Sequence, residues 1–419
     1  MCTLHRHSAL LLIAPLALAA AAYAQTAQKV SPPVAQAWID VATFSGMGMP
    51  TGTGGGASPM AGIGSLFGGG GGGAGGNAFG HTQSGAAGRH VDVTLFTRNN
   101  PSLAEAQQAV PAGFLSPALK LQAPPGGKAV PESDDEVVPH DTERPRGRFL
   151  LYWGCGATIR AGQPLVLDVA TASAADFARN FQSRRATQRG THSAAGRPVW
   201  PSKADTRMVP TNASLVGEHA FSGSGVPEGF RFQIPAPQDL MPALNLQQSD
   251  TGGATDLRWS AAPTARAYFA AAMGAGAKEE TILWTSSEQA DAGFGLLDYQ
   301  TNPAVDRWLR EKVLLAPTTT ACTVPKGVFS GQGAMLRLIG YGNELNLAHP
   351  PRPSDVRQPW NPQWAVKVRV KAVANAMLGM PDMGGMGSPG AAANPAQQPP
   401  AEEPKLPGAL DLLKGILGR

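Results

Sequence analysis

Charged and aromatic side chains are scarce in this sequence of 419 residues, at 15% and 6% of the chain. The 34 lysines and arginines are nearly balanced by 30 aspartates and glutamates, so the formal net charge is only +4. Such a small charge on a long chain does not indicate a nucleic-acid partner, and we expect none. Apolar residues make up 42% of the chain, which is enough to bury a core.

The motifs of common enzyme and metal-binding classes are missing as well. The chain has no GxSxG, HExxH or CxxC motif, and Gly126-Gly-Lys128 is followed by Ala129 where a phosphate-binding loop needs a hydroxyl. The histidines beyond residue 24 are scattered, with none at ligand spacing from another. We therefore expect no cofactor, and an enzyme would need catalytic groups that meet only in the fold.

No apolar run is long enough for a retained membrane anchor, which needs about 20 residues. The run from Ala9 to Ala22 is shorter, follows Arg6 and ends in Ala22-Tyr23-Ala24, a small-x-small cleavage site. Cys2 precedes the run, so the sequence has no lipoprotein signal. We expect residues 1–24 to be a signal peptide cleaved after Ala24, and the mature protein to be periplasmic or secreted.

Only two cysteines, Cys155 and Cys322, remain after this cleavage. In an oxidising compartment two such thiols most simply pair with each other, which predicts a disulfide between them. The alternative is two buried, reduced cysteines.

Low-complexity sequence surrounds the regions in which we expect a fold. Residues 46–88 contain six consecutive glycines, and residues 376–405 are rich in Met, Gly and Pro, so we expect both tracts to be disordered. The last segment, 406–419, has Leu410, Leu413 and Leu417 on one face of a short helix. Alone this helix is marginal, so we expect it to dock on a partner or a membrane surface. The alternative is that it folds back onto its own body.

The intervening sequence predicts a mainly β fold with few short helices. Val91, Val93 and Leu95 alternate with polar residues, and short strands of this kind recur between turn signals. We expect an N-terminal strand segment at 25–45 and two packed, β-sandwich-like units at 89–240 and 250–375. Asn302-Pro303 predicts the start of a helix with Val305, Trp308 and Leu309 facing inward.

Two resemblances accompany this pattern. Leu257, Trp259 and Tyr268 are spaced as in the early hairpin of fibronectin type III-like modules, which implies a β-sandwich. The segments Tyr152-Trp-Gly-Cys-Gly156 and 342–349 resemble a family of exported proteobacterial proteins. That resemblance implies export and no particular activity.

One polar cluster directly follows an apolar strand and is the main candidate binding site. Its members are Tyr341, Asn343, Glu344, Asn346 and His349. Loops at strand ends commonly carry binding residues. The alternative is a turn whose Asn and Glu side chains cap backbone groups.

Methionines recur at every third residue near the C-terminus, at Met377, Met380, Met383 and Met386. Thioethers are soft ligands that suit Cu(I), so these residues are a candidate metal site. The alternative is a Met- and Gly-rich linker without a ligand.

A stretch of basic residues without an acidic one forms the third candidate. Its cations are Arg179, Arg184, Arg185, Arg189, Arg197 and Lys203. Arginine suits bidentate contact with phosphate, so the stretch predicts an anionic envelope polymer as a partner. The alternative is a solvated loop.

These observations favour an exported envelope protein that binds or assembles and is not an enzyme. Its partner would be an envelope protein or an anionic envelope polymer. Two alternatives remain, a periplasmic Cu(I)-handling protein that uses its Met-rich tails and an unrecognised envelope hydrolase.

Overall fold

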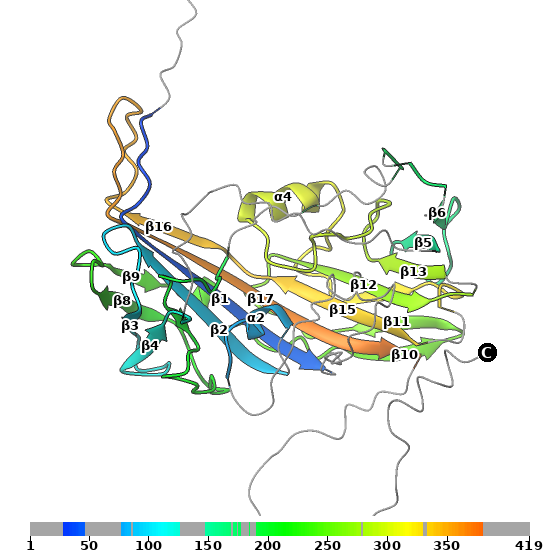
Figure 1. The fold of residues 1–419 in the computed structure, drawn as a ribbon. Helices are drawn as coiled ribbons and strands as arrows, with labels where there is room; N and C mark the ends of the chain where they lie inside the picture. The colour runs from blue at the N-terminus through cyan, green and yellow to red at the C-terminus, as the bar shows by residue number, and fades with distance from the viewer. Residues whose placement is uncertain are drawn as a thin grey trace, which may run out of the picture. The chain divides into compact units, whose positions relative to one another are not determined.

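The computed structural model describes residues 28–46, 77–84, 87–125, 147–168, 171–173, 175–176, 184, 190–277, 280–329 and 333–379. The described fold is mainly β with few short helices, as predicted (Figure 1). Its helices are α2 (His81–Ser84), α4 (Asn302–Arg310) and the 3₁₀ turn η2 (Ala236–Gln238). None of the described helices is long and apolar enough to cross a membrane.

One sheet contains fourteen of the strands. Thirteen of them follow one another in the order β6 (Leu165–Asp168), β5 (Arg148–Trp153), β13 (Glu280–Thr285), β12 (Ala267–Ala275), β15 (Ala334–Tyr341), β17 (Trp364–Leu378), β1 (Ala35–Gly46), β2 (Gly88–Thr97), β7 (Val199–Trp200), β4 (Ala118–Gln122), β3 (Glu105–Ala109), β8 (Gly217–Gly223) and β9 (Arg231–Ile234). The fourteenth, β16 (Leu345–His349), pairs with β17. A second sheet consists of β10 (Gln247–Thr251), β11 (Ala254–Arg258) and β14 (Ala321–Val324).

The strand order differs from the division into units at 89–240 and 250–375. Strands β5 and β6 come from the first range, yet β5 pairs in parallel with β13 from the second. Strand β1, expected as a separate segment, lies in the middle of the sheet between β17 and β2. Strand β1 takes this central position because its side chains are buried on both faces almost throughout.

The two faces of the central strands pack into two different apolar clusters. Ala37, Ile39 and Val41 of β1 belong to the largest apolar cluster, which also contains Leu257 and Cys322 of the second sheet. The neighbouring positions point to the opposite face. There Ala42 and Phe44 belong to a cluster covered by α4, where Val305 and Trp308 are buried as predicted.

The tracts expected to be disordered are not entirely without structure. Within 46–88, residues 77–84 include α2 and pack on β2, because the backbone N–H groups of Gly80 and Thr82 donate to the Asp92 carboxylate. At the start of 376–405, Met377 and Leu378 still belong to β17. Residues 47–76 and 380–419 lie outside the described residues, and with them the predicted C-terminal helix.

The predicted disulfide is present. Cys155 and Cys322 are bonded, with their Cα atoms 5.1 Å apart. Cys155 follows β5 of the large sheet and Cys322 lies in β14 of the second sheet. The bond therefore ties the two sheets together.

Candidate functional site

The predicted polar cluster is used mainly for internal contacts. Tyr341 is buried and its hydroxyl donates to the carbonyl of Leu296. Asn343 accepts a hydrogen bond from Arg266 at 3.0 Å. Its neighbour Glu344 is buried and pairs with Lys367 at 2.9 Å. These contacts fasten the end of β15 to β12, β17 and the loop before α4.

The other two members of the cluster are more open. Asn346 is exposed on β16, opposite Lys367 of β17. His349 is also exposed, and its ring stacks on that of Trp364 with centroids 5.6 Å apart. The structure thus brings Glu344 and Asn346 to the same lysine, but Tyr341 lies under the Leu296 loop and His349 at the far end of β16.

The methionine candidate is described only at its first member. Met377 lies in β17 opposite Met335, and Met335 lies opposite Met273 of β12. The three residues therefore form one row across three adjacent strands. The next row on the same face contains the buried Arg337 and Asn375. The positions Met380, Met383 and Met386 lie outside the described residues.

The described members of the basic stretch do not form one surface. Arg184 pairs with Asp291 and with Glu311. Arg197 is buried, with its guanidinium carbon 4.4 Å from the ring centroid of Phe96. Lys203 is exposed. The remaining cations, Arg179, Arg185 and Arg189, lie outside the described residues.

A row of buried charges crosses the central strands on the α4 side of the sheet. Asp92 of β2, Asp40 of β1 and Arg369 of β17 are direct cross-strand neighbours. Arg369 donates two hydrogen bonds of 2.6 Å to Asp40, which also accepts from the backbone and hydroxyl of Thr191. Burial works against the charged form of Arg369, but Asp40 outweighs it and raises the arginine pKa.

A second set of charged groups lies beside this row. Burial would raise the pKa of Asp298, but Lys371 at 2.9 Å and Arg369 outweigh it and lower the value to about 2. Both cations contact the ring of Tyr299, whose centroid lies 4.4 Å from the Arg369 guanidinium and 4.1 Å from the Lys371 ammonium. Burial of its hydroxyl raises the pKa of Tyr299 well above the ordinary value.

Asp92 is the member of this region whose charge changes near neutral pH. Its side chain is 1% exposed, and burial raises its pKa to about 7. Hydrogen bonds from Thr82 and Gly80 act in the opposite direction, and the charge of Asp40 adds to the increase. Because these charged groups are packed against one another, they form a structural network; the described cavities lie elsewhere.

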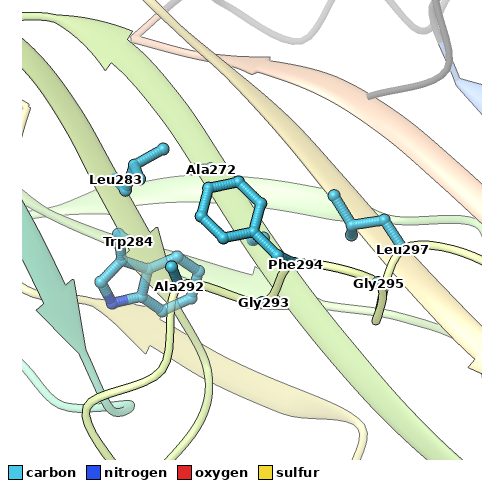
Figure 2. A pocket seen from close by; sticks show the side chains of 9 residues that line it. Ala272, Leu283, Trp284, Ala292, Gly293, Phe294, Gly295 and Leu297 are labelled. Atoms are coloured by element: carbon cyan, nitrogen blue, oxygen red, sulfur yellow. The ribbon is translucent and has the colours of Figure 1, made fainter. Parts of the chain in front are cut away.

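One small cavity lies under the loop that follows β13. It measures about 20 Å³ and is lined by apolar side chains, among them Leu283, Phe294 and Leu297 (Figure 2). A space of this size holds about one water molecule. It is therefore too small for an organic ligand.

A larger concavity lies on the outer face of β3, β4 and β8. We call it the β3–β4–β8 groove; it has a volume of about 480 Å³, within the range of about 300–1,000 Å³ typical of ligand sites. Its lining combines polar and apolar residues in about equal parts. The polar residues are Glu105, Gln107, Lys120, Gln122 and Ser222.

Strand register sets the positions of these polar groups. Gln107 of β3 lies directly opposite Lys120 of β4 on one side and Ser222 of β8 on the other. In the adjacent row, Gln122 donates to Glu105 at 3.3 Å. Two amides, a hydroxyl, an ammonium and a carboxylate thus offer both donors and acceptors on one rigid surface.

This groove was not predicted from the sequence. Strand β3 has the sequence Glu-Ala-Gln-Gln-Ala, without a β-branched or aromatic residue. A signal was present in β4, where Leu119 and Leu121 alternate with Lys120 and Gln122.

No group of three or more His, Cys, Asp or Glu side chains in the described part of the chain is arranged to hold a metal ion. No protein-family model, curated protein or solved structure matches the chain. The function of the chain is therefore inferred from the geometry of the described residues.

Proposed function

We propose that the protein is exported to the bacterial envelope and acts there by binding, without catalysing a reaction. The observation that carries this proposal is the β3–β4–β8 groove. Its polar residues come from three hydrogen-bonded strands, so the spacing of their Cα atoms is fixed before a ligand arrives. Preorganisation of this kind lowers the entropy cost of binding.

The expected location outside the cytoplasm has two supports. The N-terminal sequence has the charge, apolar run and small-x-small site of a cleaved signal peptide. The disulfide between Cys155 and Cys322 is typical of proteins that fold in an oxidising compartment. Export predicts a mature protein that begins at Gln25, which the intact mass of the protein from the periplasm or medium would test.

Binding through the groove is tested by filling it. Gln107→Trp places a large side chain in the central row, between Lys120 and Ser222. Retention of the purified mature protein on delipidated envelope material of its native cells, which offers no bilayer, should fall about ten-fold, equivalent to about 1.4 kcal/mol of binding free energy. Gln233→Trp on β9 is the matched control, because Gln233 is also an exposed strand residue but does not line the groove. Equal retention of both variants and the wild type would remove the groove from the proposal.

Cu(I) handling is the second candidate, and the row of Met273, Met335 and Met377 favours it. Thioethers from neighbouring strands can share a soft cation, although the charge of Arg337 in the next row opposes it. Met→Leu substitutions nearly conserve volume. Replacing all three residues should abolish Cu(I) uptake, measured against a chelator of known affinity, if the row binds the ion. Unchanged uptake would exclude this row.

A further inference from the structure

An ordered arm extends the central pair of strands beyond the rest of the sheet. We define the arm as residues 28–34, which precede β1, and residues 350–362, which join β16 to β17 (Figure 1, blue and orange). The backbone N–H of Trp360 donates to Lys29 at 2.9 Å, and that of Ser31 donates to Trp360 at 2.9 Å. The arm therefore continues the parallel pairing of β1 with β17.

Side chains and prolines hold the arm in one conformation. Gln28 donates to the carbonyl of Gln358 at 2.9 Å and accepts from Arg352 at 2.6 Å. The indole of Trp360 donates to the carbonyl of Pro350 at 2.9 Å. Proline fixes one backbone angle and so lowers the entropy cost of order. The prolines of the arm are Pro32, Pro33, Pro350, Pro351, Pro353, Pro359 and Pro362.

Few residues of the arm are buried. Val30 is 48% exposed and Val356 is 54% exposed, and they are two of the five large apolar residues left exposed in the described part of the chain. Fixing a residue in one conformation costs entropy, which burial normally offsets. An ordered segment with little burial is therefore better suited to an external contact than to stabilising the fold.

The charge of the arm indicates the chemistry of its partner. Lys29, Arg352 and Arg357 face only one acid of the arm, Asp355, so the arm carries a net charge of +2. Asp355 accepts hydrogen bonds of 3.0 and 2.9 Å from Arg357 and neutralises it. Among the described residues, no carboxylate forms an ion pair with Lys29 or Arg352. The Arg352 guanidinium instead lies 5.6 Å from the ring centroid of Trp360.

The arm thus combines exposed valines, a half-buried tryptophan and two cations that form no ion pair with a carboxylate among the described residues. These are the features of a membrane-surface anchor. Tryptophan is enriched at the membrane interface, and lysine and arginine are attracted to anionic lipid headgroups. We infer that the arm docks on the surface of a bilayer containing anionic phospholipids.

Vesicle binding tests this inference directly. The disulfide-bonded mature chain is sedimented with large vesicles of phosphatidylglycerol and phosphatidylcholine, and separately with vesicles of phosphatidylcholine alone. Binding should require the anionic lipid and weaken with added salt. Equal binding to both kinds of vesicle, or to neither, would overturn the inference.

Substitutions in the arm then locate the contact. Each cation near an anionic surface contributes about 1 kcal/mol, so Lys29→Gln with Arg352→Gln should weaken the partition coefficient about thirty-fold. Val30→Ser with Val356→Ser should weaken it about ten-fold through lost apolar contact. These exposed positions make little contact with the core, so circular dichroism and the thermal midpoint should stay unchanged.

Two further variants separate the arm from other sites on the chain. Lys203→Gln with Arg231→Gln removes two exposed cations from other elements and should leave vesicle binding unchanged. Leu413→Asp tests the C-terminal segment in the same way. Vesicle binding that survives the arm substitutions but is lost in either control would overturn the inference and assign the contact to that other site.

Discussion

Replacing Asp92 by asparagine should remove a large pH dependence from the stability of the protein. The Asp92 carboxyl is almost fully buried, and its pKa is raised by burial from 3.8 to about 7. Between these two values the folded protein holds a proton that the unfolded chain has released. The stabilising contribution of the protonated group is therefore complete below pH 3.8 and is lost as pH rises through 7.

The magnitude follows from the two pKa values. Stability changes by about 1.4 kcal/mol for each pH unit between them, so the loss from pH 5 to pH 7 is roughly 2–3 kcal/mol. Asparagine cannot ionise, yet its carbonyl can still accept from Thr82. Between pH 5 and pH 7 the free energy of unfolding of Asp92→Asn should therefore rise by roughly 2–3 kcal/mol relative to that of the wild type.

Urea unfolding followed by tryptophan fluorescence at pH 5, 6, 7 and 8 measures this difference. Other groups also contribute to the pH dependence of stability, among them His219, whose pKa is lowered by burial. Their contributions are common to both proteins and cancel in the difference. A difference in unfolding free energy that stays constant from pH 5 to pH 8 would refute the assignment of a raised pKa to Asp92.

Three other substitutions or treatments test the packing of the fold. Reducing the disulfide opens a loop of 167 residues, which should lower the free energy of unfolding by about 5 kcal/mol and therefore lower the urea midpoint. An unchanged midpoint would contradict the chain-entropy argument. Asp40→Leu leaves Arg369 buried without its partner and should cost about 3–5 kcal/mol, whereas adding Arg369→Met should recover part of the loss. A double variant no more stable than Asp40→Leu alone would argue against a buried ion pair. Gly190→Ala should cost about 1–3 kcal/mol, because the new Cβ would lie 1.6 Å from the Arg369 guanidinium; unaltered thermal stability would show that the 190–191 backbone lies elsewhere.

Local sequence patterns predicted the elements that are determined by their own residues. The alternation of Val91, Val93 and Leu95 predicted β2, and Asn302-Pro303 predicted the start of α4. The pairing of Cys155 with Cys322 followed from their number and the expected compartment. Each of these signals lies within a few residues or depends on chemistry that has one simple solution.

The order of the strands depends on contacts between distant parts of the chain and was not predicted. Strand β1 pairs in parallel with β17, more than 300 positions further along the sequence, and β5 pairs with β13. A short apolar run predicts a strand without specifying its neighbours. The groove was missed for a related reason, because β3 acquires its strand conformation from its ladders with β4 and β8.

The candidate polar cluster shows the same limit. Tyr341 is the last residue of β15 and Glu344 comes shortly after it, but their partners Leu296 and Lys367 lie elsewhere in the sequence. The sequence alone does not show that these side chains are already bonded to other residues of the protein. It likewise places Lys29 and Arg352 far apart, although both belong to the arm.

Side-chain NMR of glutamine during titration with a ligand fraction from the native envelope would test groove binding most directly. The side-chain amide signals of Gln107 and Gln122 report on the groove, Gln233 reports on a control strand, and the buried Gln108 reports on the fold beneath. The account predicts that the signals of Gln107 and Gln122 shift together and saturate at one ligand concentration, while those of Gln108 and Gln233 stay unchanged. Binding that leaves Gln107 and Gln122 unchanged would contradict it.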